Sequence, residues 1–198
     1  MSALSEINQA IEHCQDCELA KRRTRVVPGE GPENAQILFI GEAPGWHEDQ
    51  QGRPFVGPAG QFLEQLLSSI GLKRDQVFIA NVIKCRPPGN RDPLPGEIQT
   101  CAKWLDKQIE LLKPKMIVTL GRYSMARYFP NETISKIHGK ARKLGNITCF
   151  AMYHPAAALH QGNLRKVIEE DMLKIPPLLA ETEKIVPAEE KSKQLNLF

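Results

Sequence analysis

The chain has 198 residues, which suits one domain with a single sizeable core, and its composition is that of an ordinary soluble globular protein. No apolar stretch approaches the roughly 20 residues of a membrane span and no signal-peptide pattern is present, so we expect a cytoplasmic protein. The formal net charge of +3 permits a nucleic-acid partner but does not require one.

Apolar runs and helix-patterned segments alternate along the chain. In chain order they predict a short helix that begins the segment Ser5–Cys17, a strand at Gln36–Gly41, a helix at Gly60–Ile70, a strand at Val77–Ile83, a helix at Glu97–Leu112, a strand at Met116–Leu120, a helix at Arg122–Phe129, a strand at Ile147–Tyr153, and a helix at Leu164–Leu179 that Pro176 ends or bends. The four strands are β-branched or aromatic runs, typical of a sheet covered on both faces. The alternation predicts an α/β fold with a mainly parallel sheet.

The last residues differ in composition from the rest. Glu181–Lys193 is rich in Glu and Lys, contains Pro and has few apolar side chains. Such a segment cannot bury enough apolar surface to order itself. We therefore expect one domain over residues 1–180 and a flexible tail over residues 181–198.

Unusual residues follow the carboxyl end of each predicted strand. These segments are Gly41–Gly45 (GEAPG), Asn81–Pro88 (NVIKCRPP), Leu120–Ser124 (LGRYS) and Tyr153–Ala157 (YHPAA). In open α/β sheets ligands bind at this edge, where loops from neighbouring strands converge. Any one of these loops could be simple strand punctuation, but four together, with Glu, Asn and His among them, favour a binding site.

The chain has five cysteines, which should be reduced in the cytoplasm. Cys14 and Cys17 are spaced C-x-x-C, so two thiolates from one turn could reach one metal, while the fold would have to bring in Cys85 and Cys101. Zinc, an iron–sulfur cluster and coincidence all fit this spacing. Cys149 lies inside an apolar strand and is expected to be a core residue.

Two strand-end residues carry chemistry of their own. The turn at Gly41–Gly45 has neither the glycine spacing of a dinucleotide fingerprint nor the Lys of a P-loop; it presents the Glu42 carboxylate and several backbone N–H groups. His154 is held at a strand end by Pro155. A solvated glutamate and a structural histidine are the plain alternatives.

Taken together, the motifs resemble one family. GEAPG, the segment Gly52–Gly57 (GRPFVG), Asn81 with KCRPPGNR, YHPAAALHQGNLR and the four cysteines closely resemble family 4 uracil-DNA glycosylases, from about Cys14 to about Leu179. The resemblance implies a three-layer α/β/α fold around a mainly parallel four-stranded sheet. It also implies an enzyme that hydrolyses the N-glycosidic bond of uracil in DNA during base excision repair. A 4Fe–4S cluster would be held by Cys14, Cys17, Cys85 and Cys101.

The resemblance also implies a role for each site residue. Phe55 would stack on the flipped base, and Asn81 would read uracil and reject cytosine, because cytosine reverses the donor and acceptor at this edge. His154 would donate to uracil O2, and Glu42 would place or activate water or offset the positive charge on the sugar. Further assignments are backbone contacts from Gly41, Glu42 and Ala43 and supporting roles for Glu48 and Asn90.

The segment after His154 suits a DNA contact. The turn Leu159–Arg165 (LHQGNLR) mixes an apolar residue, Gly, Asn and Arg, which suits a wedge that fills the gap left by the flipped base. Leu159 and His160 would contact DNA there, with Arg165 on a phosphate. An ordinary helix start is the alternative. Lys21, Arg22, Arg23 and Arg25 could contact the DNA backbone or form a solvated charge run.

Two other functions compete with the glycosylase. Lys136–Lys140 (KIHGK) distantly resembles the basic insertion by which related proteins trap uracil-DNA covalently through a His. From another class, the chain could be a zinc-bound nucleic-acid module without catalysis.

The chain ends in QLNLF, which resembles the pentapeptide by which bacterial repair proteins bind the sliding clamp. Gln194, Leu195, Leu197 and Phe198 would make the contacts, and Asn196 departs from the usual residue. The alternative is an apolar C-terminus that folds back and packs against the core. We expect a monomer.

Overall fold

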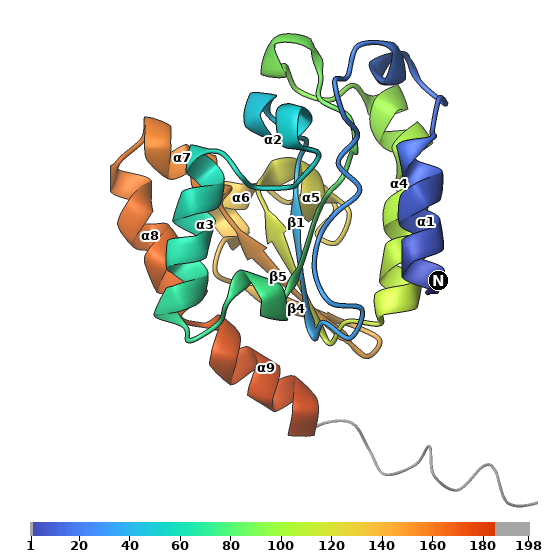
Figure 1. Cartoon of the computed structure of the whole chain (residues 1–198). Helices are drawn as coiled ribbons and strands as arrows, with labels where there is room; N and C mark the ends of the chain where they lie inside the picture. Colours follow the sequence, from blue (N-terminus) through green and yellow to red (C-terminus); the bar gives the residue numbers. More distant parts are fainter. Residues whose placement is uncertain (1, 185–198) are drawn as a thin grey trace, which may run out of the picture.

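The structure is a computed structural model, and it describes residues 2–184. Within them, five strands form one sheet in the order β2-β1-β3-β5-β4 (Figure 1). Their bounds are β1 (Ile37–Gly41), β2 (Phe78–Asn81), β3 (Met116–Leu120), β4 (Ala141–Leu144) and β5 (Ile147–Met152). All neighbours pair in parallel except β4, which runs antiparallel to β5.

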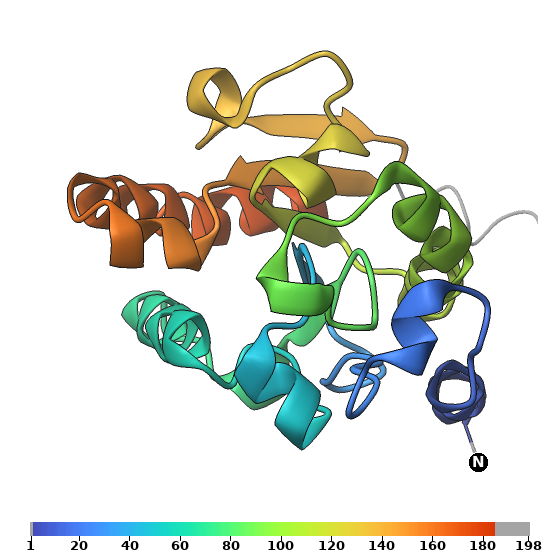
Figure 2. The same cartoon turned by 90° about the horizontal axis from the view of Figure 1, so that it is seen from above.

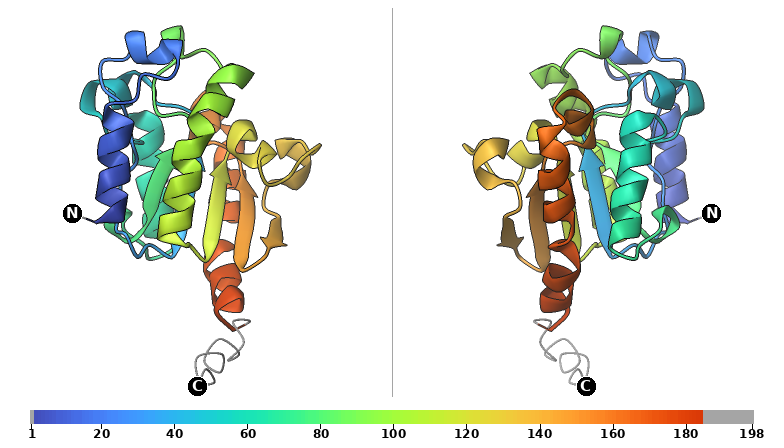
Figure 3. Two further views of the ribbon diagram at one scale, coloured as in Figure 1. Left: turned by 90° about the vertical axis from the view of Figure 1, so that its right-hand side faces the viewer. Right: turned by 90° about the vertical axis from the view of Figure 1, so that its left-hand side faces the viewer.

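Helices cover both faces of this sheet. They are α1 (Ala3–Glu12), α2 (Trp46–Gln51), α3 (Pro58–Ser69), α4 (Pro95–Leu112), α5 (Arg122–Ala126), α6 (Ile134–Ile137), α7 (Pro155–His160), α8 (Asn163–Met172) and α9 (Ile175–Lys184). Short 3₁₀ turns occur at Glu18–Lys21, Arg74–Gln76 and Pro88–Asn90. Figures 1 and 3 show α1 and α4 on one side of the sheet and α3 and α8 on the other. None of the described helices is long and apolar enough to cross a membrane.

Alternate residues of each strand enter opposite halves of the core. In β1, Leu38 and Ile40 pack in the half that contains α1, α4 and α5, whereas Ile37 and Phe39 pack in the half that contains α3 and α8. This division follows from the twofold side-chain period of a strand. The predicted three-layer α/β/α fold is confirmed.

The sheet has one strand more than the four predicted. β4 (Ala141–Leu144) is exposed along its whole length and pairs only with β5 at the edge of the sheet. The sequence predicts a strand either from a continuous apolar run or from alternation of apolar and polar residues. This four-residue edge strand, with Arg and Lys at its centre, has neither.

The last predicted helix is two helices. α8 ends at Met172, and α9 begins at Ile175 with Pro176 in its first turn, where a proline needs no hydrogen-bonded N–H. α9 continues to Lys184 and so includes the first residues, 181–184, of the segment expected to be flexible. The rest of that segment lies outside the described residues.

The carboxyl ends of β1, β2, β3 and β5 share one edge, because these strands are parallel. Seen from above, the segments that follow them surround this end of the sheet (Figure 2). The predicted convergence of loops is confirmed.

Candidate active site

A cavity of about 160 Å³ opens at this edge. Its lining comes from the segment after β1, from α2, from the connection between α2 and α3, from the start of α3, from the last residue of β2, and from the segment after β5 with the start of α7. The residues are Ala43, Gly45, Glu48, Phe55, Ala59, Asn81, His154 and Ala156. The lining is mostly small or apolar, with a few polar groups that converge. This is the usual character of a site for a small, flat ligand.

Phe55 provides the aromatic wall. Its φ of 51° lies in the left-handed region, which is rare for a bulky residue. Its ring stacks with His154, with centroids 5.4 Å apart and an interplanar angle of 24°. Contacting rings are separated by about 3.5–4 Å, so the imidazole must be offset sideways by about 4 Å. The space beside the imidazole therefore lies over the same face of the Phe55 ring as the imidazole does.

Asn81 ends β2 and lies almost fully buried, at 2% exposure. Its Oδ1 has no hydrogen-bond partner in the structure, which is costly for a buried amide unless a ligand supplies one. The last residue of β1, Gly41, lies against it. A Cβ there would be 2.4 Å from Asn81 Oδ1 and 2.7 Å from the Phe55 ring, so only glycine leaves the cavity open.

His154 is a neutral donor at physiological pH. Its Nδ1 accepts a hydrogen bond from the Ala156 N–H at 3.1 Å, so the proton of the neutral ring lies on Nε2. Burial lowers the pKa of His154 to about 4, against a small opposing effect of the Glu48 charge. The ring faces the cavity, and its Nε2–H is the group available to a ligand.

Glu48 holds the cavity wall together. Its carboxylate accepts hydrogen bonds from the Gly45 N–H at 3.1 Å and from the Val56 and Gly57 N–H groups at 2.9 Å each. It thereby ties the start of α2 to the loop that carries Phe55. Charge-assisted bonds of this kind are among the stronger ones in proteins.

Comparison with known proteins identifies the family. The model of the uracil DNA glycosylase superfamily matches residues 28–173. The type-4 uracil-DNA glycosylase of Sulfurisphaera tokodaii is 50% identical over 188 residues, which is 90% of this chain and 86% of that protein. The enzyme of the same name from Archaeoglobus fulgidus is 45% identical over 90% of this chain and 94% of its own, and that of Thermotoga maritima is 39% identical over 85% and 90%. The chain belongs to the type-4 uracil-DNA glycosylase family.

In this member of the family, Glu42 lies beside the cavity and is not among the residues that line it. Burial and the charge of Asp92 raise the pKa of Glu42, and Arg122 opposes them. Arg122 itself pairs with Asp92 and lies over the Tyr123 ring at 4.9 Å. This charged group next to Glu42 was not predicted as part of the site. The polar segment after β3, Leu120–Ser124, was the one signal for it in the sequence.

The other predicted site residues lie apart from the cavity of this type-4 glycosylase. Asn90 is exposed, and its Oδ1 accepts from Arg86 Nε at 2.6 Å. Leu159, 49% exposed, and His160 lie at the end of α7, open to solvent. Arg165 bonds to Glu169 and Gln65 at 3.0 Å each and lies 4.5 Å from the centre of the Phe62 ring. Its guanidinium thus fastens α8 to α3.

The four predicted cluster cysteines of this glycosylase come together. Cys14, Cys17, Cys85 and Cys101 line one small cavity, whereas Cys149 is a core residue of β5. As the side chains stand, no group of three or more His, Cys, Asp or Glu residues within 2–184 is arranged to hold a metal ion. Burial raises the pKa of Cys101 to about 11, so a bound metal would have to displace its proton.

The cysteine cavity also contains two cations. Arg23 donates to Cys85 Sγ at 3.1 Å, and the fully buried Lys84 lines the same cavity. Lys84 Nζ donates to the Asn81 carbonyl at 3.1 Å and to Gln108 Oε1 at 2.7 Å. Lys84 therefore connects the cysteine cavity to Asn81, which lines the cavity at the edge of the sheet.

His138 is the histidine that covalent trapping would require, and its side chain contacts other residues of the protein. Its Nδ1 lies 2.7 Å from the buried Asp171 carboxylate, and its ring packs against Tyr153 with centroids 4.8 Å apart. Lys174 also contacts Asp171, at 2.7 Å. His138 thus ties the segment before β4 to α8.

Proposed function

We propose that the protein flips uracil out of DNA and hydrolyses its N-glycosidic bond, leaving an abasic site for base excision repair. The observation that carries this proposal is Asn81, buried with an unpartnered amide oxygen in a cavity between an aromatic wall and a neutral histidine donor. The family relationship supports the same activity.

Recognition follows from the cavity geometry. A pyrimidine stacked on Phe55 would lie in the same layer as the His154 ring, beside it. Asn81 Oδ1 then accepts from uracil N3–H, and its amide nitrogen donates to O4. Cytosine has an acceptor at N3 and a donor at C4, so it leaves buried groups unpaired at a cost of several kcal/mol, on the order of 10⁴-fold in selectivity.

Hydrolysis uses two further groups. As the bond between C1′ and N1 breaks, its electron pair stays on uracil, and the His154 Nε2–H stabilises the resulting anion by donating to O2. Water attacks C1′, and the Glu42 carboxylate orients it and accepts its proton. Because its pKa is raised, the Glu42 carboxylate is a better proton acceptor than an ordinary surface carboxylate. The Ala43 backbone at the cavity wall contributes to carbonyl binding.

We propose that Cys14, Cys17, Cys85 and Cys101 hold a 4Fe–4S cluster with a structural role. The chemistry of the donor set fits, because four thiols line one cavity and two cations, Arg23 and Lys84, offset the negative charge of a cluster with four thiolates. These four cysteines would thereby join the segment after α1 to the loop after β2 and to α4 through a bound cluster. Anaerobically purified protein should contain about four irons per chain and absorb visible light. Stoichiometric zinc without iron would contradict this assignment and favour the zinc-bound module.

The activity is tested with a labelled oligonucleotide that carries one uracil. Incubation should release free uracil and leave an alkali-labile abasic site, while matched oligonucleotides with thymine or cytosine at that position stay intact. Recovery of intact uracil-DNA would refute the proposal. A denaturing gel of the same reaction separates it from covalent trapping, which would shift the DNA into a protein-bound band. The engagement of His138 with Asp171 argues against trapping.

We further propose that the terminal QLNLF peptide binds the sliding clamp, through Gln194, Leu195, Leu197 and Phe198. These residues lie outside the described ones, so the proposal rests on the sequence motif alone. A tether would raise the enzyme concentration at newly copied DNA without changing the active site. Calorimetric titration against the clamp of the source organism tests it. Deletion of residues 194–198 should abolish binding and leave uracil release from short oligonucleotides unchanged. The monomeric state and the cytoplasmic location stay predictions.

A further inference from the structure

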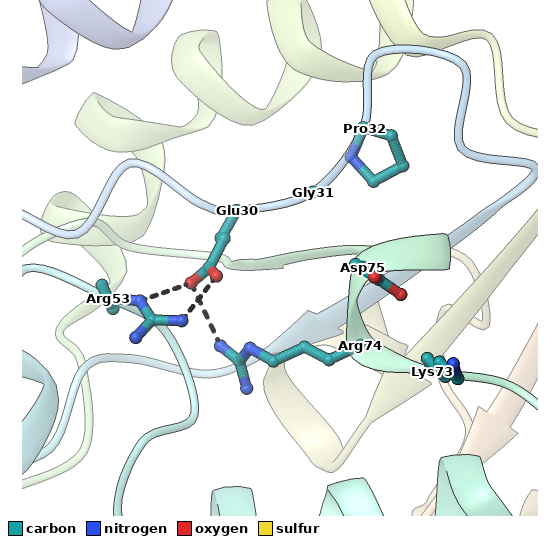
Figure 4. A pocket seen from close by; sticks show the side chains of 7 residues that line it. All are labelled: Glu30, Gly31, Pro32, Arg53, Lys73, Arg74 and Asp75. Carbon is teal, nitrogen blue, oxygen red and sulfur yellow. Dashed lines mark hydrogen bonds and ion pairs between the residues drawn. The ribbon is translucent and has the colours of Figure 1, made fainter.

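A second, larger cavity of about 600 Å³ lies beside the edge strand β2. Figure 4 shows the residues that line it: Glu30, Gly31, Pro32, Arg53, Lys73, Arg74 and Asp75. Three cations and two carboxylates are gathered there. The dashed lines in Figure 4 converge on Glu30, which pairs with Arg53 and Arg74, while Lys73 lies apart from these pairs.

Arg74 reaches from this cavity to the loop of the aromatic wall. Its side chain is only 15% exposed. Nη1 donates to the Phe55 carbonyl at 2.9 Å, and Nη2 donates to the Pro54 carbonyl. The guanidinium also contacts Glu30 at 3.3 Å and Glu64 at 3.5 Å. The planar guanidinium group thus binds the two successive carbonyls of Pro54 and Phe55 at once, which the single ammonium group of a lysine cannot do.

The loop needs this support because Phe55 is strained. A left-handed backbone conformation is unfavourable for a large side chain and persists only where the surroundings enforce it. Arg74 holds the carbonyls of Pro54 and Phe55, and Glu48 holds the next two N–H groups. Gly60 of α3 closes the third side, since a Cβ there would lie 1.9 Å from the Phe55 carbonyl oxygen.

Glu30 connects this support to the strand that carries Asn81. Its backbone N–H and carbonyl pair with Ile79 at 2.9 and 2.8 Å, two residues before Asn81 in β2. Its carboxylate receives two bonds from Arg53, at 2.7 and 3.0 Å. Although burial would raise the pKa of Glu30, the bonds from Arg53 and the charge of Arg74 hold it below its ordinary value.

We propose that Arg74 is a positioning residue for base recognition. Together with Glu30 it braces the Phe55 loop against β2, so that the stacking face and the Asn81 amide keep one fixed separation. The inference rests on the proposed uracil excision, and Arg74 contacts no substrate itself. It acts through Phe55.

A phosphate site for DNA is the competing interpretation of the same cations. It is disfavoured because two carboxylates share the cavity and because both terminal nitrogens of Arg74 already donate to protein oxygens. A positioning role predicts that loss of Arg74 alone lowers the rate of uracil release. A phosphate site predicts that loss of either Arg74 or Lys73 weakens DNA binding.

The test compares Arg74→Gln with Lys73→Gln, which removes the same charge from the neighbouring residue in the same cavity. Arg74→Gln should lower the single-turnover rate of uracil release at saturating enzyme about 10- to 100-fold, as a displacement of the order of 1 Å does. Its DNA affinity and the salt dependence of that affinity should match those of the wild type. Lys73→Gln should match the wild type in every measurement. If both variants weaken DNA binding with a shallower salt dependence, the cavity is a phosphate site and the inference is wrong.

Two further measurements make the test specific. In the Phe55→Ala background, Arg74→Gln should cause no additional loss of rate; losses that multiply would overturn the inference. Hydrogen exchange of the Val56 and Gly57 amides should be faster in Arg74→Gln and, to a smaller degree, in Glu30→Gln, which also serves if Arg74→Gln does not fold. Unchanged exchange would contradict the brace. Exchange needs no catalysis, so it tests the brace even if the wild type releases no uracil, a result that would instead refute the proposed function.

Discussion

Replacement of Gly41 by alanine should disable base recognition and leave the fold intact. The new methyl group would lie 2.4 Å from Asn81 Oδ1 and 2.7 Å from the Phe55 ring, whereas ordinary contact begins at 3.4 Å. To restore ordinary contact at both places, the Asn81 amide must retreat by 3.4 − 2.4 = 1.0 Å and the Phe55 ring by 3.4 − 2.7 = 0.7 Å. A misplacement of about 1 Å costs about 100-fold in rate, or about 2.7 kcal/mol.

The assay is single-turnover release of uracil with enzyme in excess, so that the rate reports the bound complex. The variant should still be folded at the assay temperature, because Gly41 does not need a left-handed conformation and the two displaced side chains can move into the adjoining cavity. Gly96→Ala is the matched control. Gly96 lies in the first turn of α4, and a Cβ there meets nothing within 4 Å.

Wild-type rates for Gly41→Ala would refute the assignment of this cavity to the base. A loss of rate that tracks a loss of folded protein would also contradict the reasoning, since the methyl group is expected to obstruct the ligand and not the core. A loss in Gly96→Ala of equal size would show that the effect is not specific to the cavity.

Four other substitutions probe this site and the neighbouring cysteine cavity. His154→Ala should lose roughly 2–4 kcal/mol of transition-state stabilisation in single-turnover rates, as removal of one oxyanion donor does. Because the pKa of His154 is lowered from 6.5 to about 4, the ionisation of His154 should not appear in the rate of uracil release between about pH 5 and 8. The free energy of unfolding, measured with urea, should fall from pH 6.5 towards pH 4, because over this range the unfolded chain binds a proton that the folded chain does not. His154→Gln should remove this part of the pH dependence of stability. Asn81→Asp should release some cytosine from DNA, because a protonated Asp can donate where the amide oxygen only accepted; absence of any cytosine product would contradict the reading role. Lys84→Met should lower the free energy of unfolding by about 2 kcal/mol or more, because it leaves the Asn81 carbonyl and Gln108 Oε1 buried without their donor; an unchanged urea midpoint would contradict this.

The sequence predicted the centre of the sheet well, since β1, β2, β3 and β5 are continuous apolar runs whose burial on both faces leaves a strong signal. It also predicted that loops would converge at their carboxyl ends and that four cysteines would meet. Both follow from parallel strand order and from the family motifs.

Features that depend on a distant partner could not be predicted. Arg74 looks like an ordinary surface arginine until the fold brings Pro54 and Phe55 within reach of it. The left-handed Phe55 has no signal of its own, because the residue type argues against that conformation. Arg165 carries a charge that suits a phosphate, yet neighbours on α3 and α8 occupy it. Each depends on tertiary contacts that no local pattern records.

The two outer strands of the sheet have a consequence for behaviour at high concentration. An open edge is a template on which a second chain can add its own strand, and growth from such edges leads to aggregates. Here β4 is only four residues long and presents Arg142 and Lys143, whose like charges repel another copy. On the opposite side, the segment from Val27 to Glu30 hydrogen-bonds along β2 and its extension, at Ile79 and Lys84. Both ends of the hydrogen-bonded ladder are thus obstructed, which should protect the enzyme against edge-to-edge polymerisation at high concentration.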